Sequence, residues 1–70
     1  MAYLSLGDYA KAIEYQQQHL AIAREIKDRQ SEGKALGNLG LAYHNLGDYA
    51  KAIEYTQQWL AIAREIKDRQ

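Results

Sequence analysis

The chain has 70 residues, with nine basic and nine acidic side chains, a formal net charge of zero and no cysteine. A chain of this length is one small domain that buries only about 60% of the surface its unfolded form exposes. The neutral charge argues against a nucleic-acid or membrane-surface footprint, and the lack of cysteine excludes disulfides and thiolate chemistry. We therefore expect a soluble domain, cytoplasmic or recombinant in origin, with no cofactor and no nucleic-acid or membrane partner.

Residues 1–30 repeat as residues 41–70, and this repeat organises the chain. The two copies differ only at Met1/Leu41, Leu4/His44, Ser5/Asn45, Gln16/Thr56 and His19/Trp59. A period of 40 residues predicts a helical solenoid, in which each unit buries an apolar face against its neighbour. We expect one domain over 1–70, with a partial first repeat at 1–30 and a second repeat at 31–70. Copies this similar suggest an excised or engineered fragment.

The first long helix is predicted from about residue 9 to residue 26. Residues 1–6 match the end of a helix, Gly7 is suited to the left-handed conformation that closes it, and Asp8 is suited to cap the next helix. Arg24–Asp28 and Glu25–Arg29 have the spacing of helical ion pairs. The apolar residues follow a 3.6-residue period and form a stripe broad enough for two neighbours: Tyr9, Ala12, Ile13, Tyr15, Leu20, Ile22, Ala23 and Ile26.

The junction after this helix is ambiguous. Asp28 or Ser31 is a suitable helix cap, but every residue from Lys27 to Glu32 also tolerates a helix. A hairpin and one continuous helix over 9–46 are both compatible with the sequence, and the continuous helix would allow domain swapping. The predicted hinge comprises Lys27, Asp28, Arg29, Gln30 and Ser31.

The second helix is predicted over about 30–46 and the third over about 49–68. Gly40 lies inside the apolar stripe of the second helix, where glycine costs about 1 kcal/mol relative to alanine, so we expect a close helix contact there. Gly47 and Asp48 repeat the predicted stop and cap. The buried stripe of the second helix is predicted to contain Ala35, Leu36, Leu39, Ala42, Tyr43 and Leu46.

Two short motifs carry a family resemblance. Leu39-Gly40 with Tyr43, followed by Gly47, Tyr49 and Ala52, resembles the tetratricopeptide repeat signature. The longer period is similar to the Pins/LGN-type polarity adaptors and to cyanobacterial repeat arrays. The resemblance implies an all-α fold of antiparallel helical hairpins, about one and three-quarter repeats here, in a superhelix whose concave face binds extended peptides. The sequence departs from the family pattern at Gln16, Thr56, His19 and Trp59.

Two binding modes are compatible with this resemblance. By position in the first helix of a repeat, the peptide groove would be lined by Lys34, Asn38, Leu41, His44 and Asn45, and it would accept an extended acidic segment. The alternative is self-association as a homodimer, because the last helix presents a face that would receive a further repeat. The residues predicted for self-association are Trp59, Ile62, Ile66, Tyr3 and Leu4.

Chemical sites find little support in the sequence. His19 and His44 lie on different predicted helices without the ligand spacing of a zinc site, so a metal-mediated assembly is only a third alternative. No isolated carboxylate pair lies on an apolar face, and acid–base catalysis therefore has no candidate. Tyr9, Tyr43 and Tyr49 fall on apolar stripes, where we expect core packing. The sequence predicts a non-catalytic interaction module.

Overall fold

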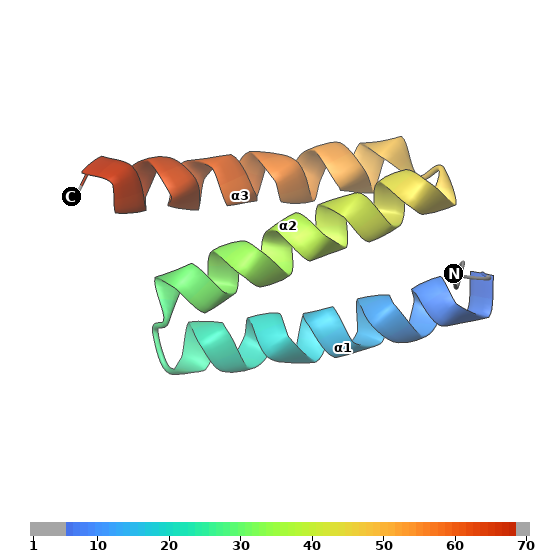
Figure 1. Cartoon of the computed structure of the whole chain (residues 1–70), viewed down its shortest axis with the longest axis horizontal. Helices are drawn as coiled ribbons and strands as arrows, with labels where there is room; N and C mark the ends of the chain where they lie inside the picture. Colours follow the sequence, from blue (N-terminus) through green and yellow to red (C-terminus); the bar gives the residue numbers. More distant parts are fainter. Residues whose placement is uncertain (1–5, 69–70) are drawn as a thin grey trace, which may run out of the picture.

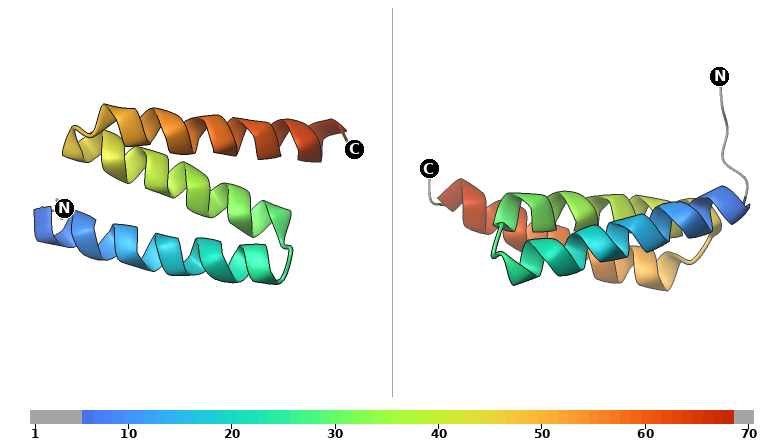
Figure 2. Two further views of the ribbon diagram at one scale, coloured as in Figure 1. Left: turned by 180° about the vertical axis from the view of Figure 1, so that it is seen from behind. Right: turned by 90° about the horizontal axis from the view of Figure 1, so that it is seen from below.

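The computed structural model describes residues 6–68, and that range forms three helices with no strand. They are α1 (Leu6–Glu25), α2 (Arg29–Leu46) and α3 (Tyr49–Asp68). Successive helices run antiparallel, and α2 lies between the other two (Figures 1 and 2). α1 and α3 each pack against α2 but not against one another. This arrangement confirms the predicted all-α fold of helical hairpins.

The turn between α1 and α2 decides the ambiguous junction in favour of a hairpin. Lys27 has a φ of 59°, a left-handed conformation that ends α1 without a glycine. Asp28 then caps α2: its carboxylate accepts hydrogen bonds from the Ser31 amide at 3.2 Å and the Ser31 hydroxyl at 2.9 Å. The continuous helix over 9–46 is therefore not adopted. The turn is also shorter than the predicted hinge, because residues 29–31 already belong to α2.

The turn between α2 and α3 follows the prediction. Gly47 has a φ of 84°, where glycine avoids the clash of a Cβ atom. Its amide donates to the carbonyl oxygen of His44 at 3.0 Å, and the carboxylate of Asp48 accepts from the Lys51 amide at 3.3 Å.

The same residue pair behaves differently in the first copy. α1 begins at Leu6 and continues through Gly7 and Asp8, so the predicted stop and cap at these residues are wrong. Glycine and aspartate tolerate both helical and turn conformations. The turn forms at Gly47 because α2 and α3 pack against each other there, and the described residues contain no such neighbour ahead of α1.

The core is centred on α2. Leu36 and Leu39 are completely buried between the flanking helices, and the predicted stripe of α2 is confirmed as part of one cluster with residues of α1 and α3. That cluster contains Ile13, Leu20, Ala35, Leu36, Leu39, Ala42 and Ile62, with Tyr43, Leu46, Tyr55 and Ile66 packed at its edge.

Gly40 permits close approach between α2 and α3. A Cβ atom at this position would lie 2.7 Å from the Thr56 hydroxyl and 3.4 Å from the Ala52 carbonyl oxygen. Gly33, two turns earlier, similarly leaves room for Ile62, whose Cγ2 would lie 3.3 Å from an added Cβ. The predicted close contact at Gly40 is confirmed, and the partner is α3.

Candidate interaction surface

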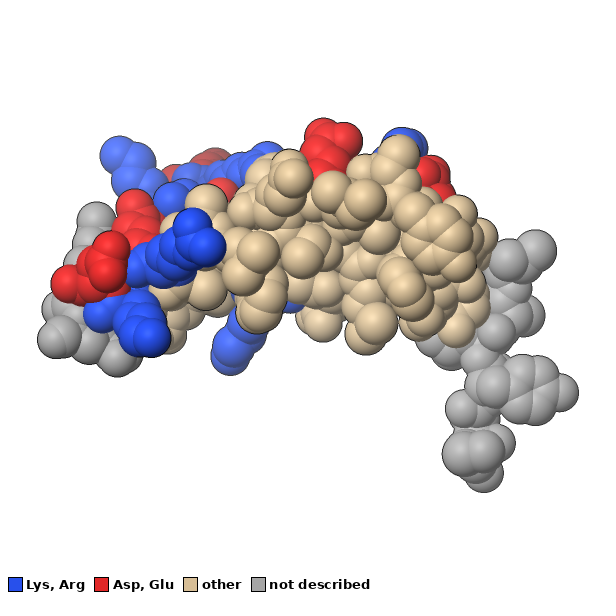
Figure 3. All heavy atoms as spheres, turned by 90° about the horizontal axis from the view of Figure 1, so that it is seen from above, with Lys and Arg blue, Asp and Glu red and all other residues tan. Residues whose placement is uncertain are grey.

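The outer side of α3 is a largely uncharged face. Figure 3 looks onto this helix and shows a continuous area without Lys, Arg, Asp or Glu, while charged side chains gather toward its C-terminal end and along its margins. The exposed large hydrophobic residues of α3 are Tyr49, Ile53, Trp59 and Leu60. We call these four residues the open face of α3. Exposed apolar areas of this kind mark interaction sites.

A groove between α2 and α3 adjoins the open face. Its volume is about 760 Å³, and most of its lining is apolar. Gly37 and Gly40 contribute no side chain to the α2 wall, which leaves the space of the groove open. Among the open-face residues, Tyr49, Ile53 and Trp59 belong to the wall. The full lining comprises Gly37, Gly40, Leu41, His44, Tyr49, Ala52, Ile53, Thr56, Gln57 and Trp59.

Trp59 lies at the end of this groove. A Cβ atom on Gly37 would be 3.2 Å from the indole Cδ1, so the absence of a side chain at Gly37 gives the ring its place. The same indole borders a second hollow that also contains Lys34 and Ile66. Trp59, which was predicted to take part in self-association, is 40% exposed. Its ring is accommodated because the facing residue of α2 is a glycine.

The tyrosines divide between edge packing and the groove. Tyr43 stacks on Tyr55, with ring centroids 5.5 Å apart, and the ammonium of Lys51 lies 5.3 Å from the Tyr43 ring. Tyr49 is instead largely exposed and meets His44 edge-on at 5.3 Å. The prediction that Tyr49 packs in the core is therefore wrong. Within the described residues, no other helix covers this side of α3.

The predicted peptide-binding residues do not form one site. Leu41 and His44 line the groove, and Lys34 borders the second hollow. Asn38 and Asn45 are exposed on α2 and line neither. The family resemblance assigned all five to the first helix of a repeat, but only two of them line the apolar groove.

The residues predicted for self-association also separate. Trp59 is accessible, whereas Ile62 is buried against α2 and offers almost no surface for a partner. Ile66 is half-buried at the edge of the core. Tyr3 and Leu4 lie outside the described residues. Sequence reasoning missed Tyr49, Ile53 and Leu60, although each occupies the position of a predicted core residue of the first copy.

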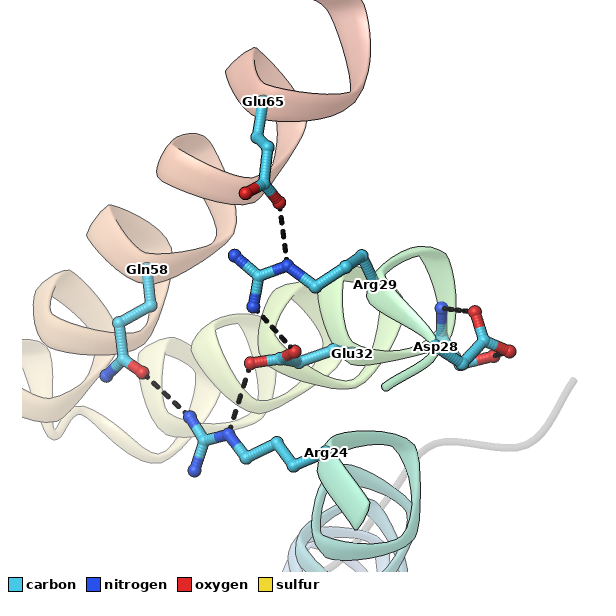
Figure 4. Close-up of polar contacts among 7 residues, drawn as sticks. Arg24, Asp28, Arg29, Glu32, Gln58 and Glu65 are labelled. Carbon is cyan, nitrogen blue, oxygen red and sulfur yellow. Dashed lines mark hydrogen bonds and ion pairs between the residues drawn. The ribbon is translucent and has the colours of Figure 1, made fainter. Parts of the chain in front are cut away.

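A polar network ties the three helices together near the turn between α1 and α2 (Figure 4). Glu32 is buried and accepts from Arg24 of α1 at 3.2 Å and from Arg29 at 2.8 Å. Arg29 also donates to Glu65 of α3 at 2.7 Å. These hydrogen bonds, Glu65 first and then Glu32, hold the pKa of Arg29 above its ordinary value.

The network corrects the predicted ion pairs. Neither Arg24–Asp28 nor Glu25–Arg29 forms; both arginines bind Glu32, and Asp28 instead caps α2. Arg24 also donates to the side-chain oxygen of Gln58 at 3.1 Å, which spans from α1 to α3. For Arg24 a contact between helices replaces the predicted local pair, because the turn brings Glu32 beside the end of α1, whereas Arg29 pairs with Glu32 within α2.

Chemical sites are not evident in residues 6–68. No group of three or more His, Cys, Asp or Glu side chains in that range is arranged to hold a metal ion. No helix in the same range is long and apolar enough to cross a membrane.

Comparison with known proteins agrees with this geometry. A family model described as "Tetratricopeptide repeat" matches residues 1–65. Human G-protein-signaling modulator 1 is 49% identical over 39 residues, which cover 56% of this chain and only 6% of that protein. Repeats of this family are protein-interaction modules and are generally not catalytic. The matched range and the stacked hairpins show that the chain belongs to the tetratricopeptide repeat family.

Proposed function

We propose that this chain is a protein-interaction module that self-associates through the open face of α3. One observation carries the proposal: identical residues in α1 and α3 have opposite exposure. Ile13 and Leu20 of α1 are 9% and 6% exposed, because α2 covers them, whereas their counterparts Ile53 and Leu60 are 58% and 41% exposed. The open face of α3 therefore has the chemistry of a helix–helix interface, and no helix among residues 6–68 covers it.

α1 also has an exposed apolar side, centred on Ile22, which we call the open face of α1. Ile22 of α1 is 56% exposed, and its counterpart Ile62 in α3 is 4% exposed. Tyr15 of the same helix and Ile26, which directly follows it, are also exposed. Joining α3 of one copy to α1 of the next would build an open chain of copies, whereas joining two α3 faces about a two-fold axis closes after two copies. We favour the closed dimer because it also covers both apolar grooves.

The energetics support a weak, concentration-dependent dimer. Burying a large apolar side chain contributes about 1.5–3 kcal/mol, and the cost of association is about 4–15 kcal/mol. The open face has four residues on each copy that are only partly exposed, so covering them gains about half of the full-burial value, roughly 6–12 kcal/mol for two copies. This gain is comparable with the cost, as expected for a weak dimer. Domain swapping through the Lys27–Asp28 turn adds nothing to this gain, because exchanging α1 between copies leaves the same faces open.

The test is light scattering after size-exclusion chromatography across about a hundredfold range of concentration. We expect a dimer that dissociates on dilution. Leu60→Lys on the open face of α3 should give a monomer, and Ile22→Lys on the open face of α1 is the matched control that should leave the dimer intact. A wild-type monomer at high micromolar concentration would contradict the proposal.

A second candidate function is binding of an extended segment of a partner protein. The observation in its favour is the groove itself, where Leu41, His44 and Trp59 form an accessible apolar wall. An acidic segment would additionally need Lys34, which lies in the second hollow beyond Trp59. Lys34→Ala should weaken binding of an acidic peptide without changing helicity, and Asn38→Ala, at a position outside both hollows, is the matched control that should not. Unchanged binding with Lys34→Ala would exclude recognition of an acidic segment.

A further inference from the structure

The equivalent arginines Arg24 and Arg64 differ in their ion pairing. Arg24 forms an ion pair with Glu32 of α2 at 3.2 Å. Arg64 lies at the same position of α3 and has no ion-pair partner among residues 6–68. The open face thus combines uncovered hydrophobic residues with an arginine whose equivalent already pairs with a glutamate of the covering helix. A partner with complementary charge would supply that glutamate.

The packing of α2 on α1 defines what such a partner must look like. α2 brings Glu32 to Arg24, and one to two turns later it brings Ala35, Leu36 and Leu39 to the apolar face of α1. These three apolar residues are completely buried. Because α3 repeats the sequence of α1, a helix with the same order of glutamate, small residue and leucines fits the open face.

We propose that the open face of α3 binds an amphipathic helix of a separate protein that resembles α2, with a glutamate paired to Arg64. The proposal rests on the proposed function only in taking the open face as a binding surface. A folded second copy cannot supply this helix, because its own α2 is already covered on both sides. The partner helix and the second copy therefore compete for the same face.

The α2 sequence itself, as a peptide of residues 29–46, is a suitable probe. An isolated helix of this length is marginal in water, so we expect weak binding with a stoichiometry of one peptide per chain. Binding is followed by the fluorescence anisotropy of a labelled peptide, because the α1 counterpart of Trp59, His19, is exposed and not covered by α2. Binding should raise the anisotropy and should convert the dimer into peptide-bound monomers.

Charge reversal tests the predicted pair. Arg64→Glu in the protein, or Glu32→Lys in the peptide, should each weaken binding about fivefold, and the two together should restore it. Lys11→Glu on α1 is the matched control for the change of charge and should have no effect. Peptide Leu36→Asp should weaken binding more than tenfold, because it places a charge in the apolar contact.

Two controls distinguish the open face of α3 from that of α1. Leu60→Lys should abolish binding and Ile22→Lys should not. A peptide with Gly40→Ala should bind as well as the original, because the proposed contact uses the leucine side of the helix and not its glycine side. Absence of binding, insensitivity to both charge reversals, or loss of binding with Ile22→Lys would each overturn the proposal. The scattering measurement on the protein alone decides self-association separately.

Discussion

α1 and α3 have nearly the same sequence, yet they bury opposite sides. α1 uses Ile13 and Leu20 to contact α2 and leaves Ile22 exposed, whereas α3 buries Ile62 and leaves Ile53 and Leu60 exposed. The difference arises because α2 lies after α1 in the stack and before α3. A repeat helix of this kind has two apolar sides, and its position in the stack determines which one is used.

The largest effects are expected when equivalent apolar side chains of α1 and α3 are truncated to alanine. Leu20→Ala should lower the free energy of unfolding by about 2–4 kcal/mol, and Leu60→Ala should lower it by less than about 1 kcal/mol, since that side chain is partly solvated. For the other side of the helices the order should reverse, with Ile62→Ala costly and Ile22→Ala mild. Urea unfolding followed by circular dichroism measures all four.

The concentration at which these variants are measured matters. Under dilute conditions, equal losses for Leu20→Ala and Leu60→Ala would contradict the burial difference between the copies. If only concentrated samples show a large loss for Leu60→Ala, the open face of α3 is covered by a second copy, which would support the proposed dimer.

A smaller effect is expected at the contact between α2 and α3. Gly40→Ala should destabilise the fold by about 1–2 kcal/mol, because the clash with Thr56 outweighs the gain in helix propensity. Thr56 is β-branched and cannot rotate away cheaply. Thr56→Ala in the Gly40→Ala background should recover most of the loss, because it removes the hydroxyl that an added Cβ would meet. A double-mutant cycle from thermal unfolding gives the coupling, and simple additivity would exclude the predicted clash.

The smallest effect concerns the turn between α1 and α2. Hydrogen bonds from Ser31 lower the pKa of Asp28 below its ordinary value. The cap therefore contributes stability above the unfolded pKa, and this contribution disappears as pH falls through the lower, folded pKa. Asp28→Ala should be less stable than the wild type at neutral pH and should lose less on acidification. Parallel acid-unfolding curves for both proteins would show that the cap is not coupled to pH.

The sequence predicted the elements of the fold well because its local signals agree. The apolar stripe of α2 and the stop at Gly47 followed by the cap at Asp48 were confirmed, and Gly40 was recognised as a close contact. The predicted groove was less accurate. The family resemblance assigned Lys34, Asn38, Leu41 and Asn45 to a binding face of one helix. Which of them border a hollow depends on where α3 lies beside them.

Some features were ambiguous because the same residues permit two structures. Lys27 to Glu32 suit a helix as well as a turn, and Gly7-Asp8 suits a turn but is helical. In both places the free-energy difference between the local conformations is small, so packing between helices determines the outcome. The ion pairs followed the same rule, since Arg24 binds a glutamate that only the hairpin brings near.

The sequence by itself determined that this protein is a stack of amphipathic helices, because a 3.6-residue apolar period and an internal repeat are properties of residue order. It also determined that the first and third helices have two apolar sides. Only the tertiary structure decided which side of each helix is covered. Burial is a property of neighbours. Two nearly identical helices acquire different surfaces when one has its neighbour on one side and the other has it on the opposite side.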